Sequence, residues 1–227
     1  MAKTIFFLFA FLSPILLSAQ TSINNMKLLH TKDSMLRVQI HADSVKIEAQ
    51  YAEEMKWENI KASAMYPVIK AGEYSGVVPV KNITEIPDPN MDYKLLFELT
   101  SANTDSAAKN VNEGLMEVAR VINLHVAAGI PIKRIMPVLV VHAAALKAIA
   151  NNAYYQKQYK MDNPNLDALK TLEKMGARII ACGQAMAFYD VTAEDLLKNV
   201  KVSLTAQTAL SSYQLKGFVL YDMRVKK

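Results

Sequence analysis

"ARIIACGQAM", residues 177–186, joins a short apolar run to a stretch of helix-forming residues without an intervening loop. A short apolar run that leads directly into a helix is typical of a buried strand in a parallel sheet. The same stretch contains Cys182, the only cysteine in the chain. It therefore indicates a fold and also a place where chemistry could occur.

The order of strand followed by helix repeats on both sides of this stretch. The repeats predict strands over 93–100, 136–142, 177–183, 201–205 and 217–223, with helices over 110–129, 143–151, 166–176, 192–200 and 206–216. The expected strands are apolar throughout, and strands of that kind are buried on both faces. We therefore expect an α/β fold, a three-layer α/β/α sandwich around a mostly parallel five-stranded sheet.

The first residues have the pattern of an export signal. Lys3 precedes an apolar stretch that begins at Ile5, and small residues follow near Ala19. This stretch is interrupted and too short to span a bilayer, so we predict a signal peptide over 1–19, cleaved after Ala19. The protein is then expected to be periplasmic or otherwise exported, without a membrane span after cleavage.

Residues 20–92 are predicted to form an N-terminal extension before the α/β domain at 93–227. The segments "MLRVQIH" (35–41) and "SVKIEAQY" (44–51) alternate as strands do, whereas residues 43–65 also fit a helix capped by Asp43 or Ser44. We favour the helix. Residues 66–90 contain four prolines, so they should be extended with turns.

Composition and motifs narrow the classes of function. Basic residues are spread along the chain except at the tail "RVKK", so there is no basic stripe to indicate a nucleic-acid partner. The sequence contains no zinc signature and no glycine-rich phosphate loop, so we expect neither a metal site nor a bound cofactor. The tyrosine-rich stretch 151–164 is expected to be a polar loop that closes over a site, contacts another subunit or is simply solvated.

Candidate site residues follow from the expected topology. Ligands of an open parallel sheet bind at the carboxyl ends of its strands, where His142 and Cys182 would both lie. A cysteine before a helix meets free backbone N–H groups that favour a thiolate, and a nearby imidazole would help. We predict Cys182 and His142 as catalytic residues and Gly183, Gln184 and Thr205 as binding residues. The amides of Gly183 and Gln184 would stabilise the sulfur.

Each of these residues also has a purely structural interpretation. A single cysteine in an apolar strand is commonly a small core residue, and from the spacing alone the two interpretations are about equally supported. For His142 taken alone, a structural hydrogen bond at the strand end is the favoured interpretation, and its expected position near Cys182 is what supports a catalytic role.

Several segments together resemble the DsrE/DsrF-like family of sulfur-relay proteins, in particular its exported branch. They are "MPVLVVHAAALKAIA", "LKTLEKMGARIIACGQAM", "EDLLKNVKVSLTAQTAL" and "YQLKGFVLYDM", and the likeness extends over about 66–223. The resemblance implies an α/β/α fold, homo- or hetero-oligomers, and a cysteine, here Cys182, that accepts sulfane sulfur as a persulfide and passes it on. Family members with a better-known cysteine follow it with a basic, glycine-containing segment, whereas this chain continues "AFYDVTAEDL".

Two functions therefore remain open. In the first, Cys182 carries sulfur between thiol or persulfide donor and acceptor proteins. A single cysteine suits a sulfur carrier better than a dithiol oxidoreductase, because there is no second cysteine to form an intramolecular disulfide. In the second, the protein is a non-enzymatic ligand-binding or oligomeric assembly module of the envelope, and Cys182 is inert. The reactivity of the thiol distinguishes the two.

Overall fold

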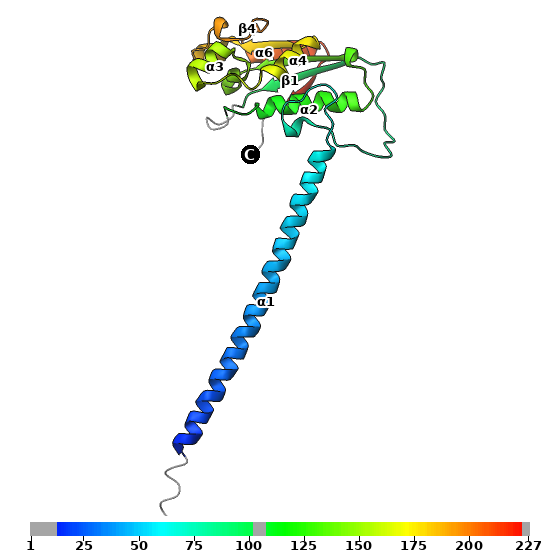
Figure 1. Cartoon of the computed structure of the whole chain (residues 1–227). Coiled ribbons are helices and arrows are strands. Elements are labelled where there is room, and N and C mark those ends of the chain that lie inside the picture. Colours follow the sequence, from blue (N-terminus) through cyan, green and yellow to red (C-terminus); the bar gives the residue numbers. More distant parts are fainter. Residues whose placement is uncertain (1–12, 102–107, 224–227) are drawn as a thin grey trace, which may run out of the picture. The chain divides into compact units, whose positions relative to one another are not determined.

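The computed structural model of this chain describes residues 13–101 and 108–223 (Figure 1), and for residues 13–19 only the backbone. The described residues form two compact units, one ending at Asn59 and the other beginning at Ile60. The predicted signal peptide therefore lies mostly outside the described residues. The predicted boundary between residues 92 and 93 stays a prediction. In the structure, residues 60–92 belong to the same compact unit as the sheet.

The first unit consists of one long helix, α1 (Ser13–Ser63), which continues into the start of the second unit. No glycine or proline occurs between residues 15 and 63, so nothing in the sequence breaks the helix. The helix favoured over 43–65 is thus part of a longer one, and the strand-like segments at 35–41 and 44–51 are helical. Among the described residues, no helix has the length and apolarity needed to cross a bilayer.

Residues 64–92 run as an extended segment along the sheet domain, as the prolines predicted. Met65 pairs with Val77 in an isolated antiparallel bridge, and a 3₁₀ turn, η1 (Glu73–Ser75), lies between them. The buried side chain of Asn123 holds this segment in place. It accepts hydrogen bonds from the amides of Val68 and Ile69 and donates to the carbonyls of Ile69 and Ser75.

The second unit is built on a five-stranded sheet in the order β4-β3-β2-β1-β5. Its strands are β1 (Tyr93–Leu99), β2 (Ile135–Val141), β3 (Arg178–Cys182), β4 (Lys201–Ser203) and β5 (Val219–Asp222). Every neighbouring pair is parallel. The α/β fold class expected from the sequence is confirmed, and each strand lies within two residues of its predicted bounds.

Burial on both faces holds for the three central strands only. β1, β2 and β3 contribute most of the core, including the fully buried Leu96, Phe97 and Leu139. The expectation that all five strands are buried is wrong for β4 and β5, whose residues are mostly exposed. These two strands are the edges of the sheet, so each has a neighbour on only one side.

Helices cover the two faces of the sheet. They are α2 (Glu113–Ala127), α4 (Leu166–Lys174), α5 (Gly183–Phe188) and α6 (Ala206–Leu215). Figure 1 shows α2 on one side of the sheet and α6 on the other. This follows from chain direction, because the chain steps from β1 out to β4 and then returns to β5 on the far side of β1, and right-handed crossovers in opposite directions lie on opposite faces.

The connections differ from the sequence prediction in three places. The stretch expected to be a tyrosine-rich loop contains a helix, α3 (Asn152–Tyr159), because the side chain of Asn151 caps its first turn by accepting from the amide of Tyr154. The helix expected over 143–151 is the 3₁₀ segment η4 (Ala143–Ile149). The helix expected over 192–200 is only the turn η5 (Ala193–Asp195), which begins with a capping box formed by Thr192 and Asp195. A further 3₁₀ turn, η3 (Ile132–Arg134), leads into β2.

Candidate functional site

A cavity of about 620 Å³ lies where the carboxyl ends of β1, β2 and β3 meet the amino terminus of α6. It is lined by Glu98, His142, Ala143, Cys182, Gln184, Ala185, Phe188, Tyr189, Thr205, Ala206 and Gln207. Four of the five residues that the sequence singled out are among them. The exception is Gly183, which does not line the cavity.

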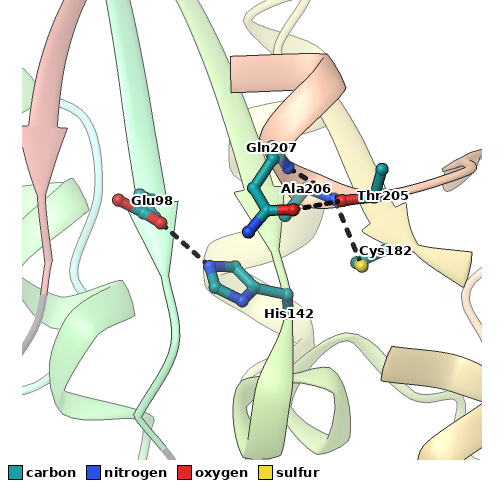
Figure 2. A network of polar contacts seen from close by, with 6 residues as sticks. All are labelled: Glu98, His142, Cys182, Thr205, Ala206 and Gln207. Atoms are coloured by element: carbon teal, nitrogen blue, oxygen red, sulfur yellow. Dashed lines mark hydrogen bonds and ion pairs between the residues drawn. The ribbon is translucent and has the colours of Figure 1, made fainter. Parts of the chain in front are cut away.

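Cys182 is the last residue of β3, and its side chain is almost fully buried at 5% exposure. Its Sγ accepts a hydrogen bond from the backbone amide of Ala206 at 3.2 Å (Figure 2). The register explains this contact, because Cys182 pairs with Ser203 and the turn from β4 into α6 therefore lies beside the sulfur. An N–H group in the first turn of a helix favours negative charge on the atom that it contacts.

The helix that contacts the sulfur is not the one expected from the sequence. The amide of Gln184 donates instead to the carbonyl of Leu204 at 3.1 Å, so it is not directed at Cys182. Gly183 lies in a confined place, because a Cβ at this position would lie 2.9 Å from the carbonyl oxygen of Ser203. Glycine lets β3 and the end of β4 approach closely, and this places Ala206 beside Cys182.

His142 follows the last residue of β2 and faces Glu98, in β1. Its Nε2 lies 3.0 Å from Oε1 of Glu98, and both side chains remain partly accessible. The parallel register places them together, since the backbone amide of His142 continues the strand pairing by donating to the carbonyl of Leu99. Figure 2 shows the ring of His142 directed at Glu98, with Cys182 and Ala206 on the opposite side. The imidazole is therefore paired with a carboxylate and not with the thiol.

The residue after His142 has an unusual backbone conformation. Ala143 has φ +51, a left-handed conformation that costs an L-residue about 1–2 kcal/mol. Ala143 lines the cavity. Strained backbone conformations of this kind are commonly found in functional sites.

Thr205 has a structural role at this site. It is the N-cap of α6, and its hydroxyl accepts from the amide of Gln207 at 3.1 Å and lies 3.3 Å from the side-chain oxygen of Gln207. This arrangement fixes the first turn of α6 and leaves the amide of Ala206 directed at the sulfur. Thr205 thus lines the cavity as the N-cap of α6, and its role in binding stays a prediction.

The tyrosine-rich segment does not line the cavity. Tyr155 is buried and its ring contacts that of Tyr159 in a tilted arrangement, with ring centroids 4.9 Å apart. Burial, together with the neighbouring Tyr159 and Tyr154, raises the pKa of Tyr155 to about 12. The phenol is therefore neutral near neutral pH, and Tyr155 serves the packing of α3.

The residues that contact His142 and Cys182 in the cavity, Glu98 and Ala206, were not among the predicted site residues. Glu98 had a detectable signal, because it is the only acidic residue in the apolar strand "YKLLFELT", and it occupies the strand end next to that of His142. Ala206 had none, because a backbone amide has no signature in the side chain. Within the described ranges 13–101 and 108–223, no three His, Cys, Asp or Glu residues are grouped as metal ligands.

Comparisons with known proteins identify a family for this chain. The model of the DsrE/DsrF-like family matches residues 94–220. Among solved structures, the protein of unknown function MTH1491 from Methanobacterium thermoautotrophicum is 17% identical with a TM-score of 0.42, the match covering 58% of this chain and 99% of that one. The ychN protein from E. coli is 14% identical with a TM-score of 0.42, the match covering 57% of this chain and 98% of that one. No curated protein matches the chain significantly.

Proposed function

Because this chain belongs to the DsrE/DsrF-like family, a family generally related to sulfur relay, we propose that it is a sulfur carrier in which Cys182 holds a sulfane sulfur as a persulfide. The observation that carries the proposal is the contact between Sγ of Cys182 and the amide of Ala206 at the wall of a 620 Å³ cavity. A thiol in this position has a donor for its negative charge and space in front of it for a second sulfur atom and its donor.

The proposed reaction needs no cofactor and balances with thiols alone. The thiolate of Cys182 attacks the outer sulfur of a donor persulfide R–S–SH, forming a new S–S bond as the donor bond breaks and R–S⁻ leaves. An acceptor thiolate then attacks the outer sulfur of the Cys182 persulfide, which restores the Cys182 thiolate and produces the acceptor persulfide. The sulfane sulfur changes partner twice, and the chain itself is neither oxidised nor reduced overall.

Glu98 and His142 support this reaction through proton transfer and orientation. The Glu98 carboxylate 3.0 Å from Nε2 orients the imidazole and favours a proton on that nitrogen. Since His142 is partly accessible and lines the same cavity as Cys182, it can exchange a proton with the thiol that leaves or enters there. His142 is therefore proposed as an acid–base residue and Glu98 as the residue that positions it.

The test is the intact mass of the purified protein after exposure to polysulfide, beside a Cys182→Ser variant. We expect sulfur-sized mass increments on the native protein only, and we expect a small thiol to remove them. A native protein that gains no sulfur, or a Cys182→Ser variant that gains as much, would refute the carrier role. His142→Gln should slow the gain without abolishing it, while leaving the reaction of denatured protein unchanged.

A second candidate function is favoured by the 5% exposure of Cys182. In that function the cavity binds a small ligand, and the cysteine is an inert part of its wall, as buried cysteines commonly are. Alkylation of the native protein separates the two proposals. A thiol that reacts at neutral pH at least as fast as free cysteine supports the carrier, and one that stays unmodified until denaturation supports the binding module.

We also propose that the protein is exported, with residues 1–19 as a signal peptide, on the strength of the apolar stretch that begins at Ile5. The intact mass of the protein recovered from a periplasmic extract tests this, since cleavage after Ala19 leaves a chain that begins at Gln20. Recovery of the uncleaved chain from the cytoplasmic fraction alone would refute it. Donor and acceptor thiol proteins are its proposed partners.

A further inference from the structure

The long helix α1 has no packing partner within its own compact unit, although it has the composition of a helix that needs one. Every residue from 20 to 59 is exposed. Large apolar side chains are among them, with Val38 at 70%, Leu29 at 65% and Ile47 at 64% exposure. Helices in proteins are stabilised mostly by packing of an apolar face, so these residues indicate contact with another molecule.

Several apolar residues of α1 form a row at alternating spacings of three and four. The row contains Leu28, Met35, Val38, Ala42, Val45 and Ala49. It is completed by Thr31 and Ala52 at the same spacing, so it extends without a gap over residues 28–52. Such a row is the seam along which helices of a coiled coil contact one another. We name it the first seam.

A second apolar row lies on the opposite side of the same helix. It contains Leu29, Leu36, Ile40, Ile47 and Tyr51, at spacings of seven and four. With about 100° of rotation per residue, its members fall within one narrow stripe, roughly 180° from the first seam. We name it the second seam. A helix with one apolar face could lie on a lipid surface, but a helix with two opposite apolar faces needs neighbours on both sides.

Polar residues separate the two seams on both sides. One polar strip includes His30, Arg37, His41 and Glu48, and the other includes Lys32, Gln39, Lys46 and Gln50. These strips keep the seams distinct and prevent α1 from being apolar all round. The helix is therefore suited to contact two neighbours and to leave its polar strips in water.

The charges of α1 indicate which molecule supplies the neighbours. Residues 20–46 contain four basic and two acidic residues, whereas residues 47–59 contain one basic and four acidic residues. Two copies of α1 that run in opposite directions would place the basic half of each against the acidic half of the other. The helix is thus complementary in charge to a second copy of itself.

We propose that copies of this chain associate through α1, that neighbouring α1 helices are antiparallel, and that the two seams bring together more than two copies. The proposal does not depend on the sulfur chemistry of Cys182. Because the seam residues lie outside the compact unit that begins at Ile60, substitutions there should leave the sheet domain folded.

The first test is the mass of the purified full chain in solution, measured by sedimentation equilibrium. The unchanged chain should have the mass of more than two copies. Val38→Glu with Val45→Glu removes the first seam, Leu36→Glu with Ile47→Glu removes the second, and each pair should reduce the mass. Gln39→Glu with Gln50→Glu adds the same two carboxylates in a polar strip and should leave it unchanged. A monomeric or dimeric parent chain, or seam variants with the parent's mass, would overturn the proposal.

The second test concerns orientation and uses disulfide formation in a Cys182→Ser background. Chains with Lys27→Cys and chains with Met55→Cys are mixed and oxidised. Antiparallel helices should give disulfides mainly between the two kinds of chain, because residue 27 of one copy lies near residue 55 of the next. Disulfides formed mainly within each kind would show parallel helices and overturn the antiparallel arrangement.

Discussion

Replacing Asn123, a buried amide in α2, with alanine should strongly destabilise the sheet domain. Asn123 is fully buried, and its side chain has four hydrogen bonds of 2.8–3.0 Å to the backbone of residues 68–75. The variant removes all four at once and leaves two N–H groups and two carbonyls facing an apolar cavity.

The size of the effect follows from those contacts. At about 1 kcal/mol for each lost hydrogen bond, with some recovery where water can enter, the free energy of unfolding should fall by about 3–5 kcal/mol. Asn123→Asp should be no better. It keeps an acceptor for the two amides but places a carboxylate oxygen against the carbonyls of Ile69 and Ser75.

The assay is urea unfolding followed by near-ultraviolet circular dichroism, extrapolated linearly to water. Gln214→Ala, an amide exposed on α6, is the matched control and should change the free energy by less than about 0.5 kcal/mol. If Asn123→Ala costs no more than this control, the view that one buried amide holds residues 68–75 against α2 is wrong.

Four further predictions test other parts of the domain. Gly183→Ala should lower stability by about 1–3 kcal/mol, because its Cβ would lie 2.9 Å from the carbonyl oxygen of Ser203 and force β3 and the end of β4 apart; urea unfolding measures this, and a crystal structure with the contact from the Ala206 amide to Cys182 unchanged would contradict it. Ala143→Gly should raise the melting temperature, since glycine adopts φ +51 without strain, and a lower melting temperature would show that the alanine methyl matters more than the strain. Tyr155→Phe should flatten the loss of stability at alkaline pH. The native pKa of Tyr155 is about 12 against about 10 when unfolded, so the stability that depends on its proton is complete below pH 10 and falls by about 2–3 kcal/mol towards pH 12; parallel curves for the two proteins between pH 9 and 12 would refute this. Asp195→Ala should cost about 0.5–2 kcal/mol by removing the capping box with Thr192, and an unchanged urea midpoint would count against that role.

The α/β fold was predictable because its signals are local. Each central strand is an apolar run long enough to be buried on both faces, and each is followed along the chain by a stretch of helix-forming residues. The errors arose where a weak local signal competed with a stronger one. Asn151 was sufficient to cap α3 in a stretch that otherwise has the composition of a loop. The alternating residues of 35–51 fit a strand pattern, but no glycine or proline ends the helix that includes them.

The candidate site was only partly predictable. The positions of its side chains in the sheet followed from the sequence, but the groups that these side chains contact did not. The rule that strand ends meet at one edge of a parallel sheet predicted that His142 and Cys182 lie near each other, and both line the same cavity. It did not identify the group that each of them contacts. His142 pairs with Glu98 because β1 is the neighbour of β2, and Cys182 meets Ala206 because β4 is the neighbour of β3.

The sequence alone therefore determined the class of fold, the positions of its strands and the two side chains at the mouth of the cavity, because apolar periodicity, capping residues and strand ends are properties of short segments. The tertiary structure alone decided the strand order, and with it the carboxylate beside His142 and the backbone amide beside Cys182. These contacts depend on which distant segments become neighbours in the sheet. Every residue except proline has a backbone N–H group, so no residue type in the sequence indicates which amide will contact the sulfur.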